Sequence, residues 1–266
     1  MLTTDPPEGA PTWVDLASAD VEGSTGFYRE LFGWEFQPAG SGAGGYGFLT
    51  LDGKMIGGVG PLMSPEQRTG WSVYFRSADV DATVKAAEQA GGTVVQPPAD
   101  VMSVGRSAML RDPAGAEFAL WQVFDPGMAG MQVVDEPGAL CWIESHTTDP
   151  GAAVAFYRKV FGWETDEMPT PAGPYTVVRP AGGNESSGFG GLHGLAEENR
   201  VAGATSEWHP YFEVTDPDAI AGKAAGKGAT TLMPPTDLPD VGRIAMFTDP
   251  YGGMFAVIRS ATPAGG

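Results

Sequence analysis

The sequence predicts an α+β protein built from four related units, each running from a strand through a helix to further strands. Two internal repeats indicate this organisation. Residues 27–36, FYRELFGWEF, return as FYRKVFGWET at 156–165, an offset of 156 − 27 = 129. Residues 71–79, WSVYFRSAD, return as WHPYFEVTD at 208–216, an offset of 208 − 71 = 137. Because each offset holds along its repeat, the chain carries two copies of one arrangement.

The first repeat predicts a capped helix between strands. Apolar residues within 27–32 recur at helical spacing, and Gly33 follows where a helix would stop. Asp20 is the candidate N-cap, and Asp149 takes its place in the second copy, followed by a proline at a favoured first helical position. A tryptophan seven residues before each cap opens a short alternating run, which is typical of a strand.

The second repeat predicts another capped helix and three strands. Residues 72–77 alternate as a strand, and Asp79 is expected to cap a helix over 80–90, as Asp216 does in the second copy. Asp-Pro-x-Gly turns are expected to join the last two strands. These strands are expected at 106–111 and 117–122 in the first half and at 243–248 and 254–259 in the second.

Together the repeats predict two domains of ordinary size. We expect a first domain over 11–124, a linker over 125–138 and a second domain over 139–260, with mobile tails at 1–10 and 261–266. The offset grows by eight residues between the repeats (137 − 129 = 8). This change places an insertion within 182–204, which is rich in Gly and Ser and is expected to be a long loop.

Composition narrows the range of partners. The formal net charge of −18 argues against nucleic acid, because phosphate binding needs clustered Lys and Arg. No apolar run approaches the length of a membrane span, and the first residues lack the pattern of a signal peptide. The single cysteine, Cys141, suits a reducing compartment, so a cytoplasmic location is expected. The expected oligomeric state is a monomer or homodimer. The acidic surface either steers a cationic ligand or only keeps the protein in solution.

A strand–helix–three-strand unit used four times, with FYRxxFGW at the first helix and DPxG before the last strand, resembles the vicinal oxygen chelate superfamily. That superfamily includes glyoxalase I, the bleomycin and fosfomycin resistance proteins and the extradiol dioxygenases. The chain is most similar to two-domain actinobacterial members labelled glyoxalase-like or hydroxylase. The resemblance implies two glyoxalase-like domains, in each of which two βαβββ units form a curved eight-stranded sheet around a cavity.

Metal-dependent members of that superfamily hold a divalent ion with two His-like ligands and one Glu. The resemblance places these ligands at Trp13, Ser72 and Ala119 in the first half and at Trp142, His209 and Ala256 in the second. Indole, serine and alanine do not bind a divalent ion, whereas imidazole does. Since one ligand cannot hold a metal that normally takes three, we expect no metal and no other cofactor.

The candidate catalytic residues are in the second half. Strand alternation puts Trp142, Glu144 and His146 on one face, where Glu144 and His146 form either an acid–base pair or a structural hydrogen bond. His209 is either a further acid–base group or a packed polar residue. His193 follows glycines and is expected to be solvated. Imidazoles make the second half the better suited to chemistry.

Ligand-binding residues are expected in both halves. Trp13 and Trp142 either stack on a flat or cationic ligand or only fill the place of a metal site. Carboxylates are expected beside them, and polar side chains on the later strands are expected in the wall. The full set is Trp13, Asp15, Ser72, Tyr74, Glu117, Trp142 and Tyr211.

These residues favour a metal-free protein that sequesters or processes a small organic metabolite or antibiotic in a Trp-lined cavity. The alternative is a metal-independent isomerase, cyclase or hydrolase that uses Glu144, His146 and His209 as acid and base. A metal-dependent lyase or dioxygenase is a third reading and ranks last, because the ligand positions are substituted.

Overall fold

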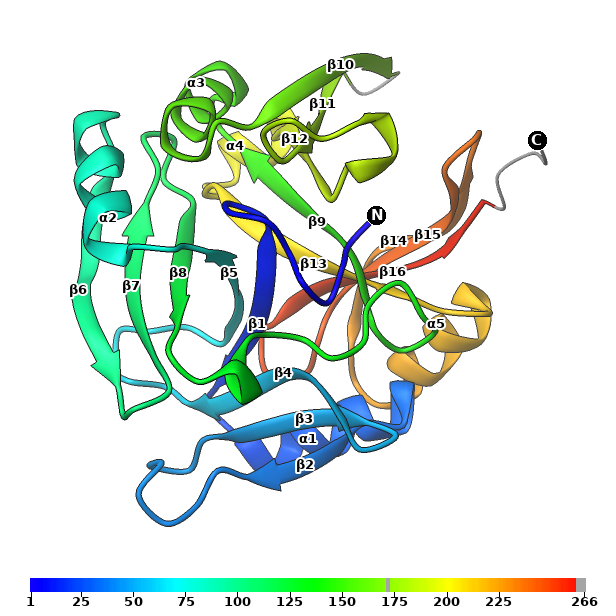
Figure 1. Cartoon of the computed structure of the whole chain (residues 1–266). Coiled ribbons are helices and arrows are strands. Elements are labelled where there is room, and N and C mark those ends of the chain that lie inside the picture. Colours follow the sequence, from blue (N-terminus) through cyan, green and yellow to red (C-terminus); the bar gives the residue numbers. More distant parts are fainter. Residues whose placement is uncertain (171–172, 262–266) are drawn as a thin grey trace. The chain divides into compact units, whose positions relative to one another are not determined.

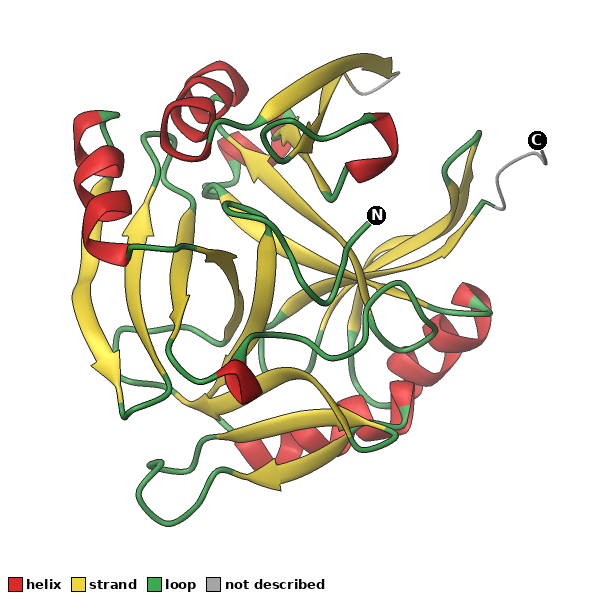
Figure 2. Cartoon of the chain, in the orientation of Figure 1, coloured by secondary structure: helices red, strands yellow, loops and turns green. Residues whose placement is uncertain are grey.

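The computed structural model describes residues 1–170 and 173–261, in which strands and short helices alternate along the chain (Figures 1 and 2). The first half contains β1 (Pro11–Ser18), α1 (Val21–Phe32), β2 (Glu35–Pro38), β3 (Gly47–Leu51), β4 (Lys54–Pro61), β5 (Gly70–Arg76), α2 (Val80–Gln89), β6 (Thr93–Val101), β7 (Gly105–Arg111) and β8 (Glu117–Val123). A 3-10 turn, η1 (Pro126–Met128), follows.

The second half repeats this order. Its elements are β9 (Leu140–Thr147), α3 (Pro150–Phe161), β10 (Glu164–Thr170), β11 (Gly173–Arg179), η2 (Glu185–Ser187), β12 (Gly190–Gly194), α4 (Glu197–Val201), β13 (Glu207–Glu213), α5 (Pro217–Gly226), β14 (Thr230–Leu238), β15 (Gly242–Thr248) and β16 (Met254–Ser260). Among the described residues, no helix is long and apolar enough to cross a membrane.

The strands form two eight-stranded mixed sheets with the same order. The first is β2-β3-β4-β1-β5-β8-β7-β6, and the second is β10-β11-β12-β9-β13-β16-β15-β14. β1 runs parallel to β4, with Asp15 opposite Gly58, and β9 runs parallel to β12, with Glu144 opposite Gly191. The predicted α+β class and the repeated βαβββ unit are confirmed.

The helix boundaries follow from the residues that the sequence places at their ends. Asp20 accepts a hydrogen bond from Gly23 N at 2.9 Å, and Asp149 accepts one from Ala152 N at 3.0 Å. Asp79 and Asp216 cap the later helices in the same way. Gly33 and Gly162 end the first helix of each half in the left-handed region, with φ of 77° and 68°, where a side chain is unfavourable.

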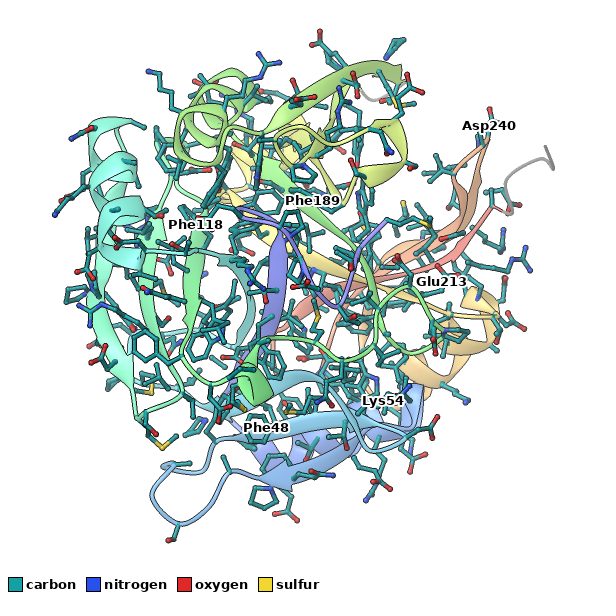
Figure 3. The ribbon with its side chains drawn as sticks, in the orientation of Figure 1. Phe48, Lys54, Phe118, Phe189, Glu213 and Asp240 are labelled. Carbon is teal, nitrogen blue, oxygen red and sulfur yellow. The ribbon has the colours of Figure 1, made fainter. Side chains whose placement is uncertain are left out.

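The described residues group into two compact units, and both draw on the two halves of the sequence. Unit 1 contains residues 1–13, 72–130 and 142–209, and unit 2 contains 14–71, 131–141 and those from Pro210 onward. The aromatic core of unit 1 joins the FYRxxFGW motif of α3 and β10 to strands β5 and β8. Phe118, labelled in Figure 3, is fully buried and packs edge-on against Tyr157, with ring centroids 5.5 Å apart.

Unit 2 has the equivalent core, built from the first copy of the motif. Trp34 stacks on Tyr28 with ring centroids 5.3 Å apart, and it meets Phe212 of β13 at 4.9 Å. A polar chain runs through these rings: Trp71 Nε1 donates to Tyr28 Oη at 3.1 Å, and Tyr28 Oη donates to Asp249 Oδ2 at 2.9 Å. Asp249 belongs to the DPxG turn, so the two repeated motifs meet at this hydrogen bond.

Unit 1 contains the same three residue types at the equivalent positions. Trp208 Nε1 donates to Tyr157 Oη at 2.8 Å, and Asp112 lies beside Tyr157. Asp112 Oδ1 accepts from Ala116 N at 3.0 Å, whereas its buried Oδ2 has no hydrogen bond of good geometry.

Residues 1–10 differ from the mobile tail that the sequence predicts. Gly9 and Ala10 are buried, and Gly9 O accepts a hydrogen bond from Trp163 Nε1 at 2.8 Å. Gly138, at the offset of 129, accepts the same bond from Trp34 at 2.7 Å. The segment before β1 therefore has the structural role that the end of the linker has before β9. The second expected tail lies outside the described residues, apart from Ala261.

The inserted residues also differ from the prediction of a single long loop. Tyr46 and Tyr175 keep the offset of 129, Gly58 and Gly191 are 133 apart, and position 72 lies 137 before position 209. The insertion is thus divided into four residues before β12, where η2 lies, and four after it, where α4 lies. The glycines near 190 obscured β12, because glycine is typical of turns.

The buried tyrosine hydroxyls are expected to contribute to stability. Tyr28→Phe leaves the buried Asp249 carboxylate and the Trp71 indole without their shared partner, so we expect a loss of about 1–3 kcal/mol in the free energy of unfolding. Urea denaturation measures this loss, and Tyr157→Phe in unit 1 provides the equivalent variant. Tyr251→Phe is the control and is expected to stay within about 0.5 kcal/mol of wild type. Equal stabilities for Tyr28→Phe and Tyr251→Phe would contradict the assignment.

Candidate functional site

All three histidines of the sequence lie together in unit 1. His146 is on β9, His193 is its neighbour across the parallel pair β9–β12, and His209 is on β13. The ring centroid of His146 is 4.8 Å from that of His209 and 5.9 Å from that of His193. We call these three residues the histidine cluster.

A carboxylate completes the cluster. Glu144 Oε1 lies 2.7 Å from His146 Nε2, and Glu144 Oε2 accepts a hydrogen bond from Tyr175 Oη at 2.8 Å. Tyr175 Oη in turn accepts one from Trp142 Nε1 at 2.9 Å. The side chains of His146 and Glu144 are 19% and 13% exposed, so the pair is mostly shielded but reachable from outside.

Local sequence explains how these groups meet. Alternation along β9 buries Cys141, Ile143 and Ser145 on one face and turns Trp142, Glu144 and His146 to the other. Tyr175 on β11 reaches Glu144 across the intervening strand β12. It can do so because Gly191 stands opposite Glu144: a Cβ there would overlap the Tyr175 hydroxyl.

Burial sets the charge state of His193 and His209. His209 is 3% exposed, and desolvation lowers its pKa to about 3, with the neighbouring His146 adding to this effect and Glu144 opposing it. Desolvation also lowers the pKa of His193. Burial, followed by the charge of Glu144, raises the pKa of Tyr175 well above its usual range. At neutral pH His193 and His209 are thus uncharged imidazoles, and Tyr175 is a phenol that keeps its proton.

The structure brings Trp142, Glu144, His146 and His209 together. The expectation that His193 is solvated is wrong, since it lies within β12, is half-buried and faces His146. Sequence reasoning missed Tyr175, although Tyr175 and Tyr46 share the offset of 129 that marks the repeat.

Two predicted ligand-binding residues lie in unit 2. Asp15 Oδ1 accepts a hydrogen bond from Tyr46 Oη at 2.8 Å, the first-half counterpart of the Glu144–Tyr175 pair. Tyr211 is buried and its hydroxyl lies 4.0 Å from Met246 Sδ. Their ligand-binding roles stay predictions.

The other predicted ligand-binding residues lie in unit 1. Trp13 is buried in β1, and Ser72 and Tyr74 are half-buried on β5. Glu117 is exposed at the start of β8, where cross-strand register sets it beside Arg111 in an ion pair. That ion pair weakens the expectation that Glu117 is a second cavity carboxylate, because its charge is already matched at the surface.

Comparison with known proteins gives one match in each half of the sequence. The family profile described as a glyoxalase-like domain matches residues 13–121 and again residues 142–258. The chain belongs to the glyoxalase-like family. This result confirms the resemblance to the vicinal oxygen chelate superfamily that the repeated motifs indicate.

Two relatives of this glyoxalase-like chain match it over almost their full length. CFP32 of Mycobacterium tuberculosis (strain CDC 1551 / Oshkosh), which is named as a provisional glyoxylase, is 37% identical over 260 residues, covering 96% of each chain. The anthracycline biosynthesis protein DauV of Streptomyces sp. (strain C5) is 36% identical over 273 residues, also covering 96% of each chain.

Solved structures share the fold at low identity. The Mn(II)-bound glyoxalase from Novosphingobium aromaticivorans has a TM-score of 0.66 and 14% identity, covering 95% of this chain and 82% of its own. The 2,2',3-trihydroxybiphenyl 1,2-dioxygenase from Sphingomonas wittichii RW1 has a TM-score of 0.65 and 16% identity, covering 96% and 91%. This likeness shows the fold alone.

The side chains at the expected metal positions do not fit a divalent ion. In the second half Trp142 and the fully buried Ala256 supply no atom that binds a metal, and His209 is the single imidazole at these three positions. The first half offers Trp13, Ser72 and Ala119. Across residues 1–170 and 173–261, the histidine cluster included, no three His, Cys, Asp or Glu side chains are arranged to hold a metal ion. The chemistry proposed below therefore uses no metal ion.

We expect His209 to make stability depend on pH. Its folded-state pKa of about 3 is below the unfolded value of about 6.5, so below pH 6.5 the unfolded chain binds a proton that the folded chain does not. Stability from this group is complete above pH 6.5 and falls by about 1.4 kcal/mol per pH unit toward pH 3. Urea denaturation at several pH values should show a shallower slope for His209→Gln. Parallel curves for the two proteins would contradict a buried neutral His209.

The substituted ligand positions predict that the protein purifies without a stoichiometric transition metal. Elemental analysis of protein prepared without added ions is expected to give far less than one Mn, Fe, Ni or Zn per chain. The control is a measurement after dialysis against each ion, which detects weak loading. One tightly held ion per chain, lost together with activity on chelation, would contradict this expectation.

Proposed function

We propose that the chain binds a small organic molecule at the histidine cluster and moves a proton on it without a metal ion. The 2.7 Å contact between Glu144 Oε1 and His146 Nε2 carries this proposal. A carboxylate that orients an imidazole is the usual arrangement of a general acid–base pair. The partial exposure of both side chains leaves room for a ligand atom to approach.

The surroundings of the pair support proton transfer more than capture of a cation. Both oxygens of Glu144 are already hydrogen-bonded, one to Tyr175 and one to His146, so the carboxylate is a weaker partner for an ammonium group than an unpaired one. The neighbouring His209 is neutral and can hydrogen-bond a ligand oxygen. A neutral ligand that carries hydroxyl or carbonyl groups fits this set of partners.

The reaction class that follows is proton abstraction next to a carbonyl, or from a hydroxyl, leading to isomerisation, cyclisation or hydrolysis. The DauV relative is named for anthracycline biosynthesis, and anthracyclines are planar molecules rich in hydroxyl and carbonyl groups. Planar aromatic hydroxyketones are therefore the first ligands to test. The aromatic rings of Trp142 and Tyr175 offer faces for such molecules.

Sequestration without chemistry is the second candidate. The Asp15–Tyr46 pair favours it, because unit 2 repeats the carboxylate–tyrosine contact without any histidine. A protein that only holds its ligand needs the polar contact but not the imidazole. Ligand binding without turnover would support this candidate.

Deuterium exchange tests the proposal directly. A general base that abstracts a carbon-bound proton also catalyses its exchange with solvent, so we would incubate aromatic hydroxyketones, anthracyclines among them, with the protein in D₂O and follow mass by mass spectrometry. His146→Gln and Glu144→Gln are each expected to lower the exchange rate by about 10²-fold or more. Tyr251→Phe is the folding-matched control. Exchange that is unchanged in both variants would overturn the acid–base proposal, and quenching of tryptophan fluorescence would show whether binding remains.

A further inference from the structure

Building on the proposed function, we infer that Trp142 and Tyr175 are positioning residues. They orient Glu144 and His146 so that Nδ1 of His146 is the nitrogen that accepts the proton of the ligand. The inference rests on the direction of one continuous chain of hydrogen bonds, from Trp142 through Tyr175 and Glu144 to His146. Neither tryptophan nor tyrosine needs to touch the reacting atoms for this role.

The direction of the chain is set by its first member. An indole N–H can only donate, so the contact at 2.9 Å makes Tyr175 Oη the acceptor. A phenol has one hydrogen, and with its oxygen already accepting from Trp142, that hydrogen points to Glu144 Oε2 at 2.8 Å. Burial of Tyr175 raises its pKa and keeps this hydrogen in place. Glu144 is therefore held by a donor on Oε2, which directs Oε1 to His146.

The tautomer of His146 follows. An ionised carboxylate has acceptors only, so the 2.7 Å contact at Oε1 requires the hydrogen on Nε2 of His146. In the neutral imidazole the lone pair is then on Nδ1, at the other side of the ring from Glu144. A ligand proton is taken up at Nδ1, and the resulting imidazolium is stabilised by Glu144.

Gly191 is needed for the same chain of hydrogen bonds. Tyr175, His193 and His146 are in register across β11, β12 and β9, so the tyrosine ring must pass over β12 to reach Glu144. Only the missing side chain at Gly191 leaves space for it, since a Cβ at that position would overlap the Tyr175 hydroxyl. Gly191→Ala thus displaces Tyr175 without removing any hydrogen-bonding group.

The first half supplies a matched control. Tyr46 Oη donates to Asp15 at 2.8 Å, and a Cβ at Gly58 would overlap the Tyr46 hydroxyl in the same way. No histidine of the chain belongs to unit 2, where this pair lies. Gly58→Ala and Tyr46→Phe make the same local changes as Gly191→Ala and Tyr175→Phe, but in the unit that contains no histidine.

NMR of the imidazole nitrogens determines the tautomer of His146 without a substrate. With ¹⁵N-labelled protein above neutral pH, long-range ¹⁵N–¹H correlation distinguishes a protonated Nε2 from a protonated Nδ1. The chain has three histidines, so loss of one ring system in each of His146→Gln, His193→Gln and His209→Gln assigns every signal. For wild type we expect His146 with hydrogen on Nε2, strongly deshielded and protected from exchange with water.

The variants test the positioning role. Tyr175→Phe and Gly191→Ala are expected to move the His146 Nε2–H signal upfield, to speed its exchange with water and to lower the turnover rate by about 10²-fold. Tyr46→Phe and Gly58→Ala are expected to leave this signal and its exchange with water at wild-type values. Circular dichroism and the urea midpoint verify that all four proteins are folded.

Two results would overturn the inference. One is a wild-type His146 protonated on Nδ1, and the other is a Nε2–H signal that Tyr175→Phe and Gly191→Ala leave unchanged. Failure of the proposed function has a different signature: the signals respond as described, yet no ligand in the panel exchanges protons.

Discussion

The hydrogen bond from Tyr28 to Asp249 joins two residues that are 221 positions apart, and the aromatic core of unit 2 is arranged around it. Both partners belong to repeated motifs: the tyrosine comes from FYRxxFGW and the aspartate from DPxG. Trp71 donates a hydrogen bond to the same tyrosine. The phenol therefore provides a hydrogen-bond partner for both an indole and a carboxylate inside a packed core. Unit 1 has the same three residue types at the equivalent positions: Trp208 donates to Tyr157, and Asp112 lies beside Tyr157. The repeated motifs are thus explained by core chemistry, because a buried polar group requires its partner.

The repeats made the fold predictable from the sequence, whereas much of the candidate site depends on strand register. Asp20, Asp149 and Gly33 identified helix ends because capping acts over a few neighbouring residues. Alternation on β9 likewise placed Glu144 and His146 on one face. The contribution of Tyr175 was not visible, since it comes from a strand two positions away in the sheet and depends on Gly191.

Glycine also explains why β12 was missed. The run around Gly190 and Gly191 has the composition of a loop, yet those glycines lie in β12, where they leave room for side chains of neighbouring strands. His193 was therefore expected to be solvated, although it faces His146. Gly9 lies in the segment that was expected to be a mobile tail, yet it is buried, with φ of 73°, against Phe161.

The division of each core between distant segments has a consequence for synthesis of the protein. Unit 2 needs Phe27, Tyr28 and Trp34 from early in the chain and Phe212 and Phe255 from late in it. While the ribosome is still producing the middle of the chain, the aromatic face of α1 lacks its partners from β13 and β16. High contact order of this kind slows folding and leaves apolar surface exposed to other chains. The nascent first half therefore exposes apolar surface until β13 and β16 have been synthesised.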